Sequence, residues 1–415
     1  MTNLTTTEIR QPRFVRWVNQ GGEILERLHI RPVNLSPERL METARKQTGL
    51  SDWGEEDFRT PLTVLLDAYE KEADLSLLGR VMVQKNIVRL LANRLRIQRD
   101  FTRHPEMLQQ PVHKPLFIVG LPRTGTTLLF NLLDLDPGAR TPRWWELYLP
   151  SPPPKKETRY TDPRIALVHK QSRHMERMIP LIRTIHPMDP MLPEECYFIF
   201  QIMFSTWVVN LMYNVPTYGR WLAQHDMVPA YRYYRSVLQL LQWRTPGEHW
   251  TLKAPHHLFH LDALLAVFPD ACIIHTHRDL VKVIGSSCSL MAMLRRMNTR
   301  RAEPAAIGAA ILNELATGVD RAMEVRKKAP AERFYDLQYR DFIADPKGQI
   351  RKIYDYFDYP FAERMAADMS LWLNEDRRQQ RGVHHYSLAQ FGLSAQQIRE
   401  RFAAYMEQYH IEAEE

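Results

Sequence analysis

Residues 116–133, LFIVGLPRTGTTLLFNLL, combine a short apolar run, a loop of glycine and hydroxyl residues, and a run with helical spacing. The run 116–119 is continuously apolar and lies between a proline and a glycine, which predicts a strand that is buried on both faces. From Thr126 onward the apolar residues are spaced as in a helix. A strand, a tight loop and a helix in this order predict the first unit of a parallel α/β sheet.

The same alternation continues toward the C-terminus. Runs typical of buried strands lie at 250–253, 271–276 and 334–337. Segments with helical spacing lie at 126–135, 257–268, 281–296 and 307–327. Because strands alternate with helices in this way, the sequence predicts an α/β fold, a P-loop-like open parallel sheet flanked by helices.

Two regions depart from this alternation. Before residue 111 the apolar residues keep helical spacing from Phe58 to Leu95, so we expect a helical N-terminal region at 1–110 and the α/β domain at 111–415. The consecutive prolines at 152–154 exclude both a helix and strand pairing there. The Met-, Trp- and Tyr-rich residues that follow lack the α/β alternation and predict a helical insertion at about 155–245.

The composition is that of a globular protein with a mild basic excess. Of 415 residues 45% are hydrophobic, and Lys plus Arg exceed Asp plus Glu by 7, which favours anionic small molecules over nucleic acid. Three cysteines form no C-x-x-C pair, so we expect neither a disulfide framework nor a metal site. The sequence contains no run of 18 apolar residues and no apolar secretory signal, so we expect a cytoplasmic protein without a transmembrane segment.

The loop between the first strand and its helix has the chemistry of an anion site. Its glycines allow a tight turn that points backbone N–H groups and the helix N-terminus at one anion, and its threonines add hydroxyl donors. The spacing matches the triphosphate loop G-x-x-x-x-G-K-[ST], but Thr126 stands where that motif has lysine. The loop instead carries a cation at Arg123, which indicates an anion other than a triphosphate with Mg²⁺.

At this loop the sequence resembles the sulfotransferases that use 3′-phosphoadenosine 5′-phosphosulfate (PAPS). Their 5′-phosphosulfate loop has a Pro-Lys/Arg-Ser/Thr-Gly-Thr-Thr core between a strand and a helix, and the similarity is greatest to a bacterial branch with Leu-Pro-Arg-Thr-Gly-Thr-Thr. The resemblance covers roughly residues 112–400 and implies that the donor's phosphosulfate binds at Pro122, Arg123, Thr124, Gly125, Thr126 and Thr127.

A second match follows the strand at 271–276. In these enzymes an arginine just beyond a strand and a serine eight residues later hold the 3′-phosphate, and Arg278 and Ser286 have that spacing here. The planar guanidinium suits a phosphate dianion, and a serine two turns along the same helix can face the same ligand. The resemblance therefore implies a 3′-phosphate site at these two residues.

Two weaker matches lie nearer the C-terminus. The segment 336–346, DLQYRDFIADP, resembles the family's segment before a C-terminal helix and would place Tyr339 by the adenine. The segment 381–387, RGVHHYS, resembles the loop that closes over the donor, and there Arg381 or His384 would add to the 3′-phosphate site.

Candidate catalytic residues cluster after the strand at 250–253. Lys253 ends this strand and is followed closely by His256 and His257, which puts a cation and two imidazoles at the carboxyl edge of the sheet, where open α/β folds bind ligands. Sulfuryl transfer needs charge stabilisation on the leaving phosphate and a base for the acceptor proton. Lys253 suits the first role; for the base we favour His257, with His256 and Glu195 as alternatives.

The aromatic-rich residues 197–243 supply mostly core, and some of them suit the wall of an apolar acceptor pocket. We therefore expect a small apolar acceptor such as an alcohol, a phenol or a lipid. Two other functions fit the same fold: a P-loop kinase-like phosphotransferase, and a non-catalytic nucleotide-binding protein. The missing loop lysine and the Arg278–Ser286 pair argue against the kinase.

Overall fold

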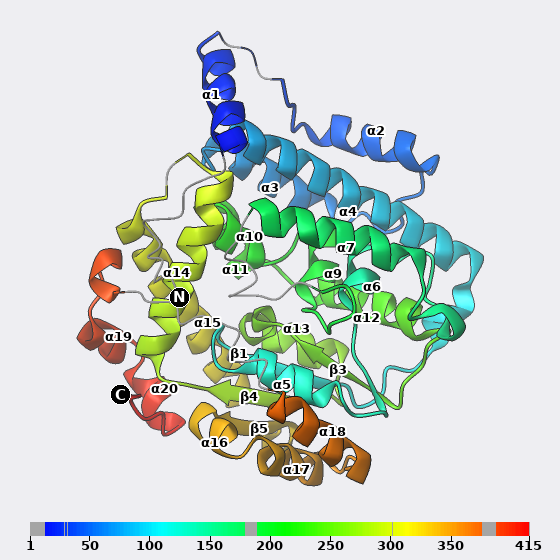
Figure 1. The fold of residues 1–415 in the computed structure, drawn as a ribbon, viewed down its shortest axis with the longest axis vertical. Coiled ribbons are helices and arrows are strands. Elements are labelled where there is room, and N and C mark those ends of the chain that lie inside the picture. Colours follow the sequence, from blue (N-terminus) through cyan, green and yellow to red (C-terminus); the bar gives the residue numbers. More distant parts are fainter. Residues whose placement is uncertain are drawn as a thin grey trace.

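The structure is a computed structural model and describes residues 13–28, 30, 32–178, 189–300, 302–375 and 387–414. Its centre is a five-stranded sheet in the order β2-β3-β1-β4-β5 in which every pair of neighbours is parallel. The strands are β1 (Leu116–Gly120), β2 (Ala139–Arg140), β3 (His249–Lys253), β4 (Cys272–His277) and β5 (Phe334–Gln338). Four of them lie where the sequence predicts strands, and the predicted open parallel sheet is confirmed (Figure 1).

Helices surround this sheet on both faces. Those of the N-terminal part are α1 (Arg13–Arg27), α2 (Pro37–Thr48), α3 (Arg59–Lys71) and α4 (Leu77–Arg103). Between β1 and β3 lie α5 (Thr126–Leu133), α6 (Trp144–Tyr148), α7 (Pro163–Met178), α9 (Tyr197–Ile202), α10 (Val208–Met212), α11 (Pro216–Gln224) and α12 (Val228–Gln242). After β3 come α13 (Leu261–Val267), α14 (Leu280–Asn298), α15 (Pro304–Arg326), α16 (Tyr339–Ala344), α17 (Pro346–Phe357), α18 (Glu363–Asn374), α19 (Ala395–Arg401) and α20 (Ala403–Gln408).

The predicted helices therefore exist, with one difference after β3. Where the sequence predicts one helix over 257–268, the chain first makes a 3₁₀ turn, Pro255–His260, and α13 begins only at Leu261. The proline has no N–H to donate and starts this tighter turn. The turn matters for the site because it carries His256 and His257.

Two hydrophobic clusters cover the two faces of the sheet. Ile118 of β1 belongs to the smaller cluster, with Phe130 of α5 and Ile353 of α17. Phe117, the preceding residue, belongs to the larger cluster. Because successive side chains of a strand point to opposite faces, this alternation identifies the face on which a strand residue lies.

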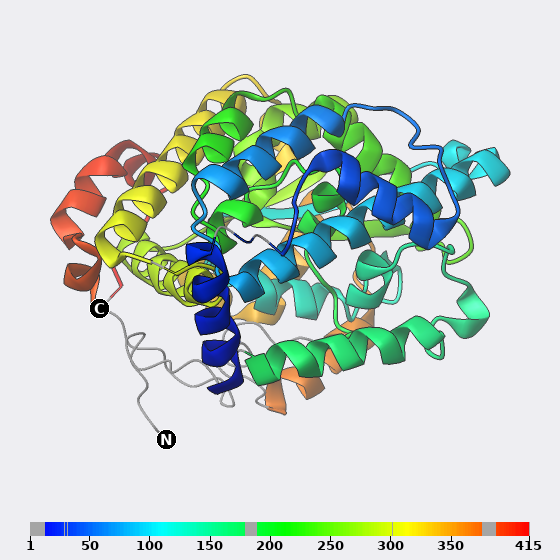
Figure 2. The ribbon, with the colours of Figure 1, turned by 90° about the horizontal axis from the view of Figure 1, so that it is seen from above.

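The larger cluster also contains the core of the N-terminal helices. Leu65 of α3 and Leu91 of α4 belong to it together with Phe200 of α9 and Phe117 of β1. The long helix α4 begins at a serine cap, where the Ser76 hydroxyl accepts from the Gly79 N–H at 3.1 Å. Figures 1 and 2 show α1 to α4 on the side of the molecule away from β5. The division of the chain near residue 110 stays a prediction.

Within the described ranges, no helix contains an apolar stretch long enough to span a bilayer.

Candidate active site

The carboxyl ends of three neighbouring strands bring the predicted site residues together. In the parallel register Ile118 of β1 lies opposite Lys253 of β3, and Gly120 lies opposite Thr276 of β4. The loop after β1 is thus flanked by the end of β3 on one side and by the end of β4 on the other. Residues far apart in the sequence meet at this edge, as expected for ligand sites of open parallel sheets.

The loop from Gly120 to Thr127 has an unusual backbone. Arg123 has φ 71°, in the left-handed region that costs a non-glycine residue about 1–3 kcal/mol and that is often found at functional sites. Gly125 has φ 84°, and a Cβ there would lie 2.9 Å from Cδ2 of Tyr339, so glycine is required for two reasons. This conformation turns the chain sharply into α5.

The start of α5 is arranged to receive an anion. Gly125 is the N-cap residue and has no side chain to accept from the first N–H groups of the helix. The hydroxyl of Thr124 is used within the loop, where it donates to the Leu121 carbonyl at 2.7 Å and lies 2.7 Å from the Thr276 hydroxyl. Thr127 is half-buried. The hydrogen-bond donors that this loop offers to an anion are therefore mainly the backbone N–H groups at the start of α5, because the Thr124 hydroxyl is already engaged.

Four residues predicted to bind the donor contact one another beside this loop. The Arg123 Nε donates to the Ser286 hydroxyl at 3.0 Å, and the Arg278 Nη1 donates to the Arg123 carbonyl at 2.9 Å. The Arg278 guanidinium lies 3.9 Å from the ring centroid of Tyr339. The structure thus places the two arginines, the serine and the tyrosine in one group, although 216 residues separate Arg123 from Tyr339 in the chain.

Arg278 has a partner that the sequence does not predict. Its Nε and Nη2 donate to the two carboxylate oxygens of Glu414 at 2.7 and 2.8 Å, a bidentate ion pair. The backbone N–H of Glu414 donates to the Asp279 carboxylate at 3.0 Å, which fixes the C-terminal segment beside Arg278. The carboxylate of Glu414 therefore binds the guanidinium for which a phosphate is predicted. Arg381 and His384 lie outside the described residues.

Lys253 and Glu195 form the second part of the site. The Lys253 ammonium lies 2.5 Å from a Glu195 carboxylate oxygen, and both side chains are largely buried. The ammonium also lies 6.0 Å from the ring centroid of Phe130, so Lys253 is on the face of the sheet that carries α5 and the anion loop. The neighbouring Glu194 is buried, and its carboxylate accepts from the Glu195 N–H at 2.8 Å.

His256 and His257 lie elsewhere, in the larger hydrophobic cluster. The Tyr231 hydroxyl is 2.9 Å from Nδ1 of His257, whose ring packs edge-on against Phe117, the strand residue of the opposite face. Burial lowers the pKa of His256 to about 3 and holds the pKa of His257 well below its ordinary value. Both rings pack against residues of the larger cluster, His257 on Phe117 and His256 on Phe200, whereas Glu195 is the candidate base that contacts Lys253.

A cavity of about 560 Å³ is enclosed by helices, and its lining includes residues that follow Glu195 closely in the chain. Tyr197 and Phe198, which follow Glu195 closely in the chain, line it, and so do Trp144 and Tyr148 of α6. The other wall comes from helices that the sequence does not connect to the site. These lining residues are Leu78, Val81, Met82, Lys85, Asn86, Ile87, Arg89 and Leu90 of α4, and Gln171, His174 and Met175 of α7.

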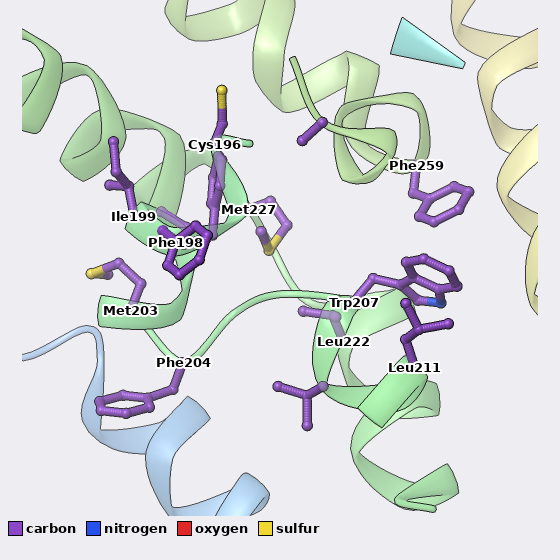
Figure 3. Packing of buried hydrophobic residues seen from close by; sticks show 14 of the residues in the cluster. Cys196, Phe198, Ile199, Met203, Phe204, Trp207, Leu211, Leu222, Met227 and Phe259 are labelled. Carbon is purple, nitrogen blue, oxygen red and sulfur yellow. The ribbon is translucent and has the colours of Figure 1, made fainter. Parts of the chain in front are cut away.

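The aromatic-rich segment divides between this cavity and the core. Phe198, Phe204, Met212 and Tyr213 line the cavity, and Trp207 packs edge-on against Phe259 at 5.4 Å between ring centroids. Figure 3 shows Phe198 on α9, Phe204 in the loop that follows and Trp207 at the start of α10, with the Trp207 side chain well apart from the other two. The prediction that most of this segment is core and that part of it lines a pocket agrees with this arrangement.

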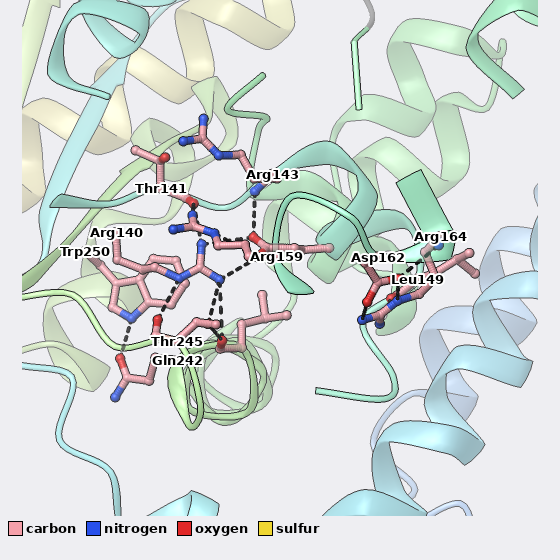
Figure 4. Close-up of polar contacts among 12 residues, drawn as sticks. Arg140, Thr141, Arg143, Leu149, Arg159, Asp162, Arg164, Gln242, Thr245 and Trp250 are labelled. Carbon is pink, nitrogen blue, oxygen red and sulfur yellow. Dashed lines mark hydrogen bonds and ion pairs between the residues drawn. The ribbon is translucent and has the colours of Figure 1, made fainter. Parts of the chain in front are cut away.

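A buried ion pair supports the cavity wall formed by α6. The Arg140 guanidinium of β2 donates to both oxygens of Glu146 in α6, at 2.9 and 2.8 Å, and its Nε donates to the Thr245 carbonyl at 3.1 Å (Figure 4). The backbone N–H of Arg143 donates to the same carboxylate at 2.9 Å. Because Trp144 belongs to α6 and lines the cavity, this network fixes a wall of the cavity to the edge strand.

One cluster outside the site has the composition of a metal centre. His275, His277 and Asp336 offer three ligand atoms within 4.8 Å of one another. However, the Arg326 guanidinium donates to Asp336 at 2.5 and 2.9 Å and lies 3.0 Å from Nδ1 of His275. A guanidinium in this position repels a cation, so the cluster is a structural ion pair between α15 and the sheet.

The fold and the site together define an α/β protein with a glycine- and threonine-rich loop at the carboxyl edge of a parallel sheet and a cavity with a mainly apolar lining among its helices. A family model described as the sulfotransferase family matches residues 115–363, more than half of the chain, and the protein belongs to this family.

One relative is an omega-hydroxy-beta-dihydromenaquinone-9 sulfotransferase, Stf3, of Mycobacterium bovis. It is 31% identical over 252 residues, which are 58% of this chain and 62% of the relative. The match thus spans less than two thirds of that relative's length.

Two solved structures are similar over most of the chain. Sulfotransferase STF1 from Mycobacterium tuberculosis H37Rv is 33% identical, with a TM-score of 0.81, and the match covers 89% of this chain and 98% of that structure. Sulfotransferase STF9 from Mycobacterium avium is 31% identical, with a TM-score of 0.85 and coverage of 92% and 99%. Unlike the family model, these matches extend well beyond residues 115–363, so the likeness includes helices outside the α/β core.

Proposed function

We propose that this protein transfers the sulfuryl group of PAPS to a hydroxyl of an apolar acceptor. The observation that carries the proposal is the meeting, at one sheet edge, of the anion loop, the Arg278–Ser286–Tyr339 group and the Lys253–Glu195 pair. Membership of the sulfotransferase family supports it. The kinase-like alternative is less well supported because Thr126 replaces the lysine of a triphosphate loop.

The donor would bind along the edge from β1 to β5. Its 5′-phosphosulfate would accept from the N–H groups at the start of α5 and pair with Arg123, and its 3′-phosphate would pair with Arg278 and Ser286. Tyr339 lies under Arg278 and would pack against the adenine. Arg123, Arg278 and the N–H groups at the start of α5 would offset much of the charge of this nucleotide, so we expect it to bind without a divalent metal.

The chemical step divides between Lys253 and Glu195. The bond between sulfur and the phosphate oxygen breaks while a bond between sulfur and the acceptor oxygen forms, and negative charge grows on the leaving phosphate. The Lys253 ammonium lies on the face of the anion loop and would stabilise this charge. Glu195 would accept the proton of the acceptor hydroxyl, and its contact with Lys253 keeps its carboxylate at the point of transfer.

The acceptor would occupy the cavity that Tyr197 and Phe198 line, and its hydroxyl would have to reach Glu195. The cavity is lined mainly by apolar and aromatic side chains, and its volume of about 560 Å³ is in the range of small-molecule sites. The Mycobacterium bovis relative is named for a hydroxylated menaquinone. From that name we extend to this chain only the class of acceptor, a hydroxyl compound with a large apolar part.

Two measurements test this function. Calorimetry with PAPS, adenosine 3′,5′-bisphosphate and ATP, with and without Mg²⁺, should show metal-independent binding of the two 3′-phosphorylated nucleotides only. Transfer of labelled sulfuryl from PAPS to a panel of apolar alcohols and phenols should then show turnover. Preferred binding of ATP with Mg²⁺ would favour a kinase, and binding of PAPS without any turnover would favour a non-catalytic nucleotide-binding protein.

A pair of variants tests the base. Glu195→Gln keeps the size of the side chain and should lower turnover of alcohols by roughly two powers of ten, while leaving the affinity for adenosine 3′,5′-bisphosphate within a few-fold. His257→Asn is the matched control and should keep an unchanged pH–rate profile. If His257→Asn instead loses the basic limb of the profile and Glu195→Gln does not, the imidazole is the base.

A further inference from the structure

Exposed apolar side chains concentrate at one end of the chain. Among the described residues ten large hydrophobic side chains are exposed, and half of them lie between residues 17 and 30: Trp17, Val18, Ile24, Leu28 and Ile30. Single exposed apolar residues are ordinary, but such a concentration in one helix and its end marks a surface for a partner.

Helix α1 has two distinct faces. One face is anchored on α4: Val15 is buried, and the Asn19 side chain accepts from the Leu78 N–H at 3.2 Å. The other face carries Trp17, Ile24 and Leu28, at spacings of seven and four residues that keep them on one stripe. Trp17 is 76% exposed and Leu28 is 61% exposed, so among the described residues little covers this stripe.

Helix α7 adds positive charge. It contains four arginine or lysine residues and one glutamate. Lys170, Arg173 and Arg177 are exposed and follow one another at spacings of three and four residues, which places them on one stripe. Leu167, one turn before Lys170, is exposed as well. The helix thus presents a basic stripe that continues into an apolar residue.

Helix α7 borders the apolar cavity, and α1 contacts a residue that lines it. Leu78, the residue that α1 contacts, lines the cavity, and so do His174 and Met175 of α7. Lys85 of α4 and His174 of α7 are exposed and also line it, which places its opening near α7. Figure 2 shows α1, in dark blue, and α7, in green, along the same side of the molecule.

We propose that α1 and α7 form a surface that docks on an anionic lipid bilayer, so that a membrane-dissolved acceptor enters the cavity without crossing water. The apolar stripe of α1 would insert at the interface, where tryptophan is favoured, and the basic stripe of α7 would pair with anionic headgroups. The origin of the acceptor rests on the function proposed above, whereas binding of the bilayer does not depend on it.

The charge on α7 favours a bilayer over a second copy of this chain. In a symmetric dimer built on this surface each chain presents the same patch, so the two basic stripes would approach one another. Like charges brought together oppose such an interface. An anionic bilayer satisfies the apolar and the basic stripe at the same time.

Co-sedimentation with vesicles tests the proposal. The full chain should bind vesicles of phosphatidylcholine with phosphatidylglycerol and bind pure phosphatidylcholine much more weakly. Trp17→Ser with Ile24→Ser should weaken binding about tenfold per side chain. Lys170→Gln with Arg173→Gln should weaken it about fivefold per charge and make the remainder less sensitive to salt.

A matched control lies on α18, which Figure 1 shows at the other end of the molecule. Leu371 is 64% exposed and Arg364 is also exposed, so Leu371→Ser with Arg364→Gln removes one apolar side chain and one cation elsewhere and should leave vesicle binding unchanged. Unchanged affinity for adenosine 3′,5′-bisphosphate shows that each variant is folded.

The results of these experiments distinguish a membrane-docking surface from a dimer interface and from failure of the proposed function. Absence of binding to anionic vesicles, or an equal loss in the α18 control, overturns the proposal. A change from dimer to monomer in Trp17→Ser with Ile24→Ser, at unaltered vesicle binding, also overturns it and assigns the surface to a second copy. Vesicle binding that depends on both stripes, in a protein that transfers no sulfuryl group, supports the surface and overturns the proposed function alone.

Discussion

The contact between Arg278 and Glu414 leads to a quantitative prediction about donor binding. If Arg278 holds the 3′-phosphate, the donor must displace the Glu414 carboxylate, which already makes two hydrogen bonds to it. Replacing this carboxylate by an amide, Glu414→Gln, keeps the shape and removes the charge. We therefore predict that this variant binds adenosine 3′,5′-bisphosphate more tightly than the wild type.

The size of the effect follows from the environment of the pair. The two side chains are 22% and 29% exposed, so water screens their attraction, and an ion pair in such a position contributes about 1 kcal/mol. The wild-type donor affinity is reduced by the fraction of molecules in which Glu414 occupies Arg278. Removing about 1 kcal/mol of competition should lower the dissociation constant about fivefold.

Calorimetry with two nucleotides and one control variant measures this effect. Adenosine 5′-phosphosulfate lacks the 3′-phosphate, so its affinity should not change in Glu414→Gln. Glu412→Gln removes the same charge two residues away, where Glu412 pairs with the exposed Arg340, and should leave both affinities unchanged. Equal tightening of both nucleotides, or tightening in Glu412→Gln, would refute the assignment of Arg278 to the 3′-phosphate.

Further predictions concern rate and stability. Lys253→Ala should lower the single-turnover rate by about two to three powers of ten with little change in donor affinity; loss of affinity alone would contradict its role. Glu146→Gln leaves the buried Arg140 guanidinium without its carboxylate and should lower the free energy of unfolding in urea by about 3–5 kcal/mol, whereas the exposed control Glu157→Gln should not. Stability should also fall as the pH decreases from about 6.5 toward 3, because the unfolded chain binds a proton that buried His256, with its pKa lowered to about 3, does not bind. The slope from this group is about 1.4 kcal/mol per pH unit, and urea unfolding of His256→Asn should show a shallower dependence.

The sheet was predictable because its three central strands, β1, β3 and β4, are buried along their whole length. The run 116–119 is continuously apolar, and the runs at 250–253, 271–276 and 334–337 are short and rich in apolar or aromatic residues, unlike the spacing of the helices between them. Strand β2 has only two residues, Ala139–Arg140, and too short a pattern to be recognised. With the strands placed, the positions of the anion loop, Lys253 and Arg278 at one edge followed from parallel pairing.

The choice of base was not predictable in the same way. Lys253, His256 and His257 are close in sequence, but the 3₁₀ turn that begins at Pro255 directs both imidazoles into the core. Glu195 precedes Lys253 by 58 residues and approaches it through a loop whose path no local pattern reveals. The base assignment therefore depends on tertiary packing, and our preference for His257 from the sequence gives way to Glu195 as the proposed base.

Long-range contacts account for the other differences. Glu414 pairs with Arg278 across 136 residues, and a single glutamate near a chain end has no pattern that predicts such a partner. For α4 the spacing of apolar residues predicted a helix, and burial of part of its surface was expected. Val81, Met82 and Leu90 line a cavity because α7 and α9 leave space beside them. The spacing of apolar residues within one helix cannot predict where other helices lie.

The loop that would bind the donor and the cavity that would bind the acceptor are built from different elements. Acceptor preference can therefore change separately from donor binding. The anion loop and its neighbours are attached to strand ends, whereas much of the cavity wall comes from α4 and α7. Substitutions on these helices can reshape the cavity without altering the backbone of the loop or the register of the sheet. A chimera that receives α4 and α7 together from a relative should thus exchange acceptor preference while keeping its donor, which makes these two helices the natural unit for engineering specificity.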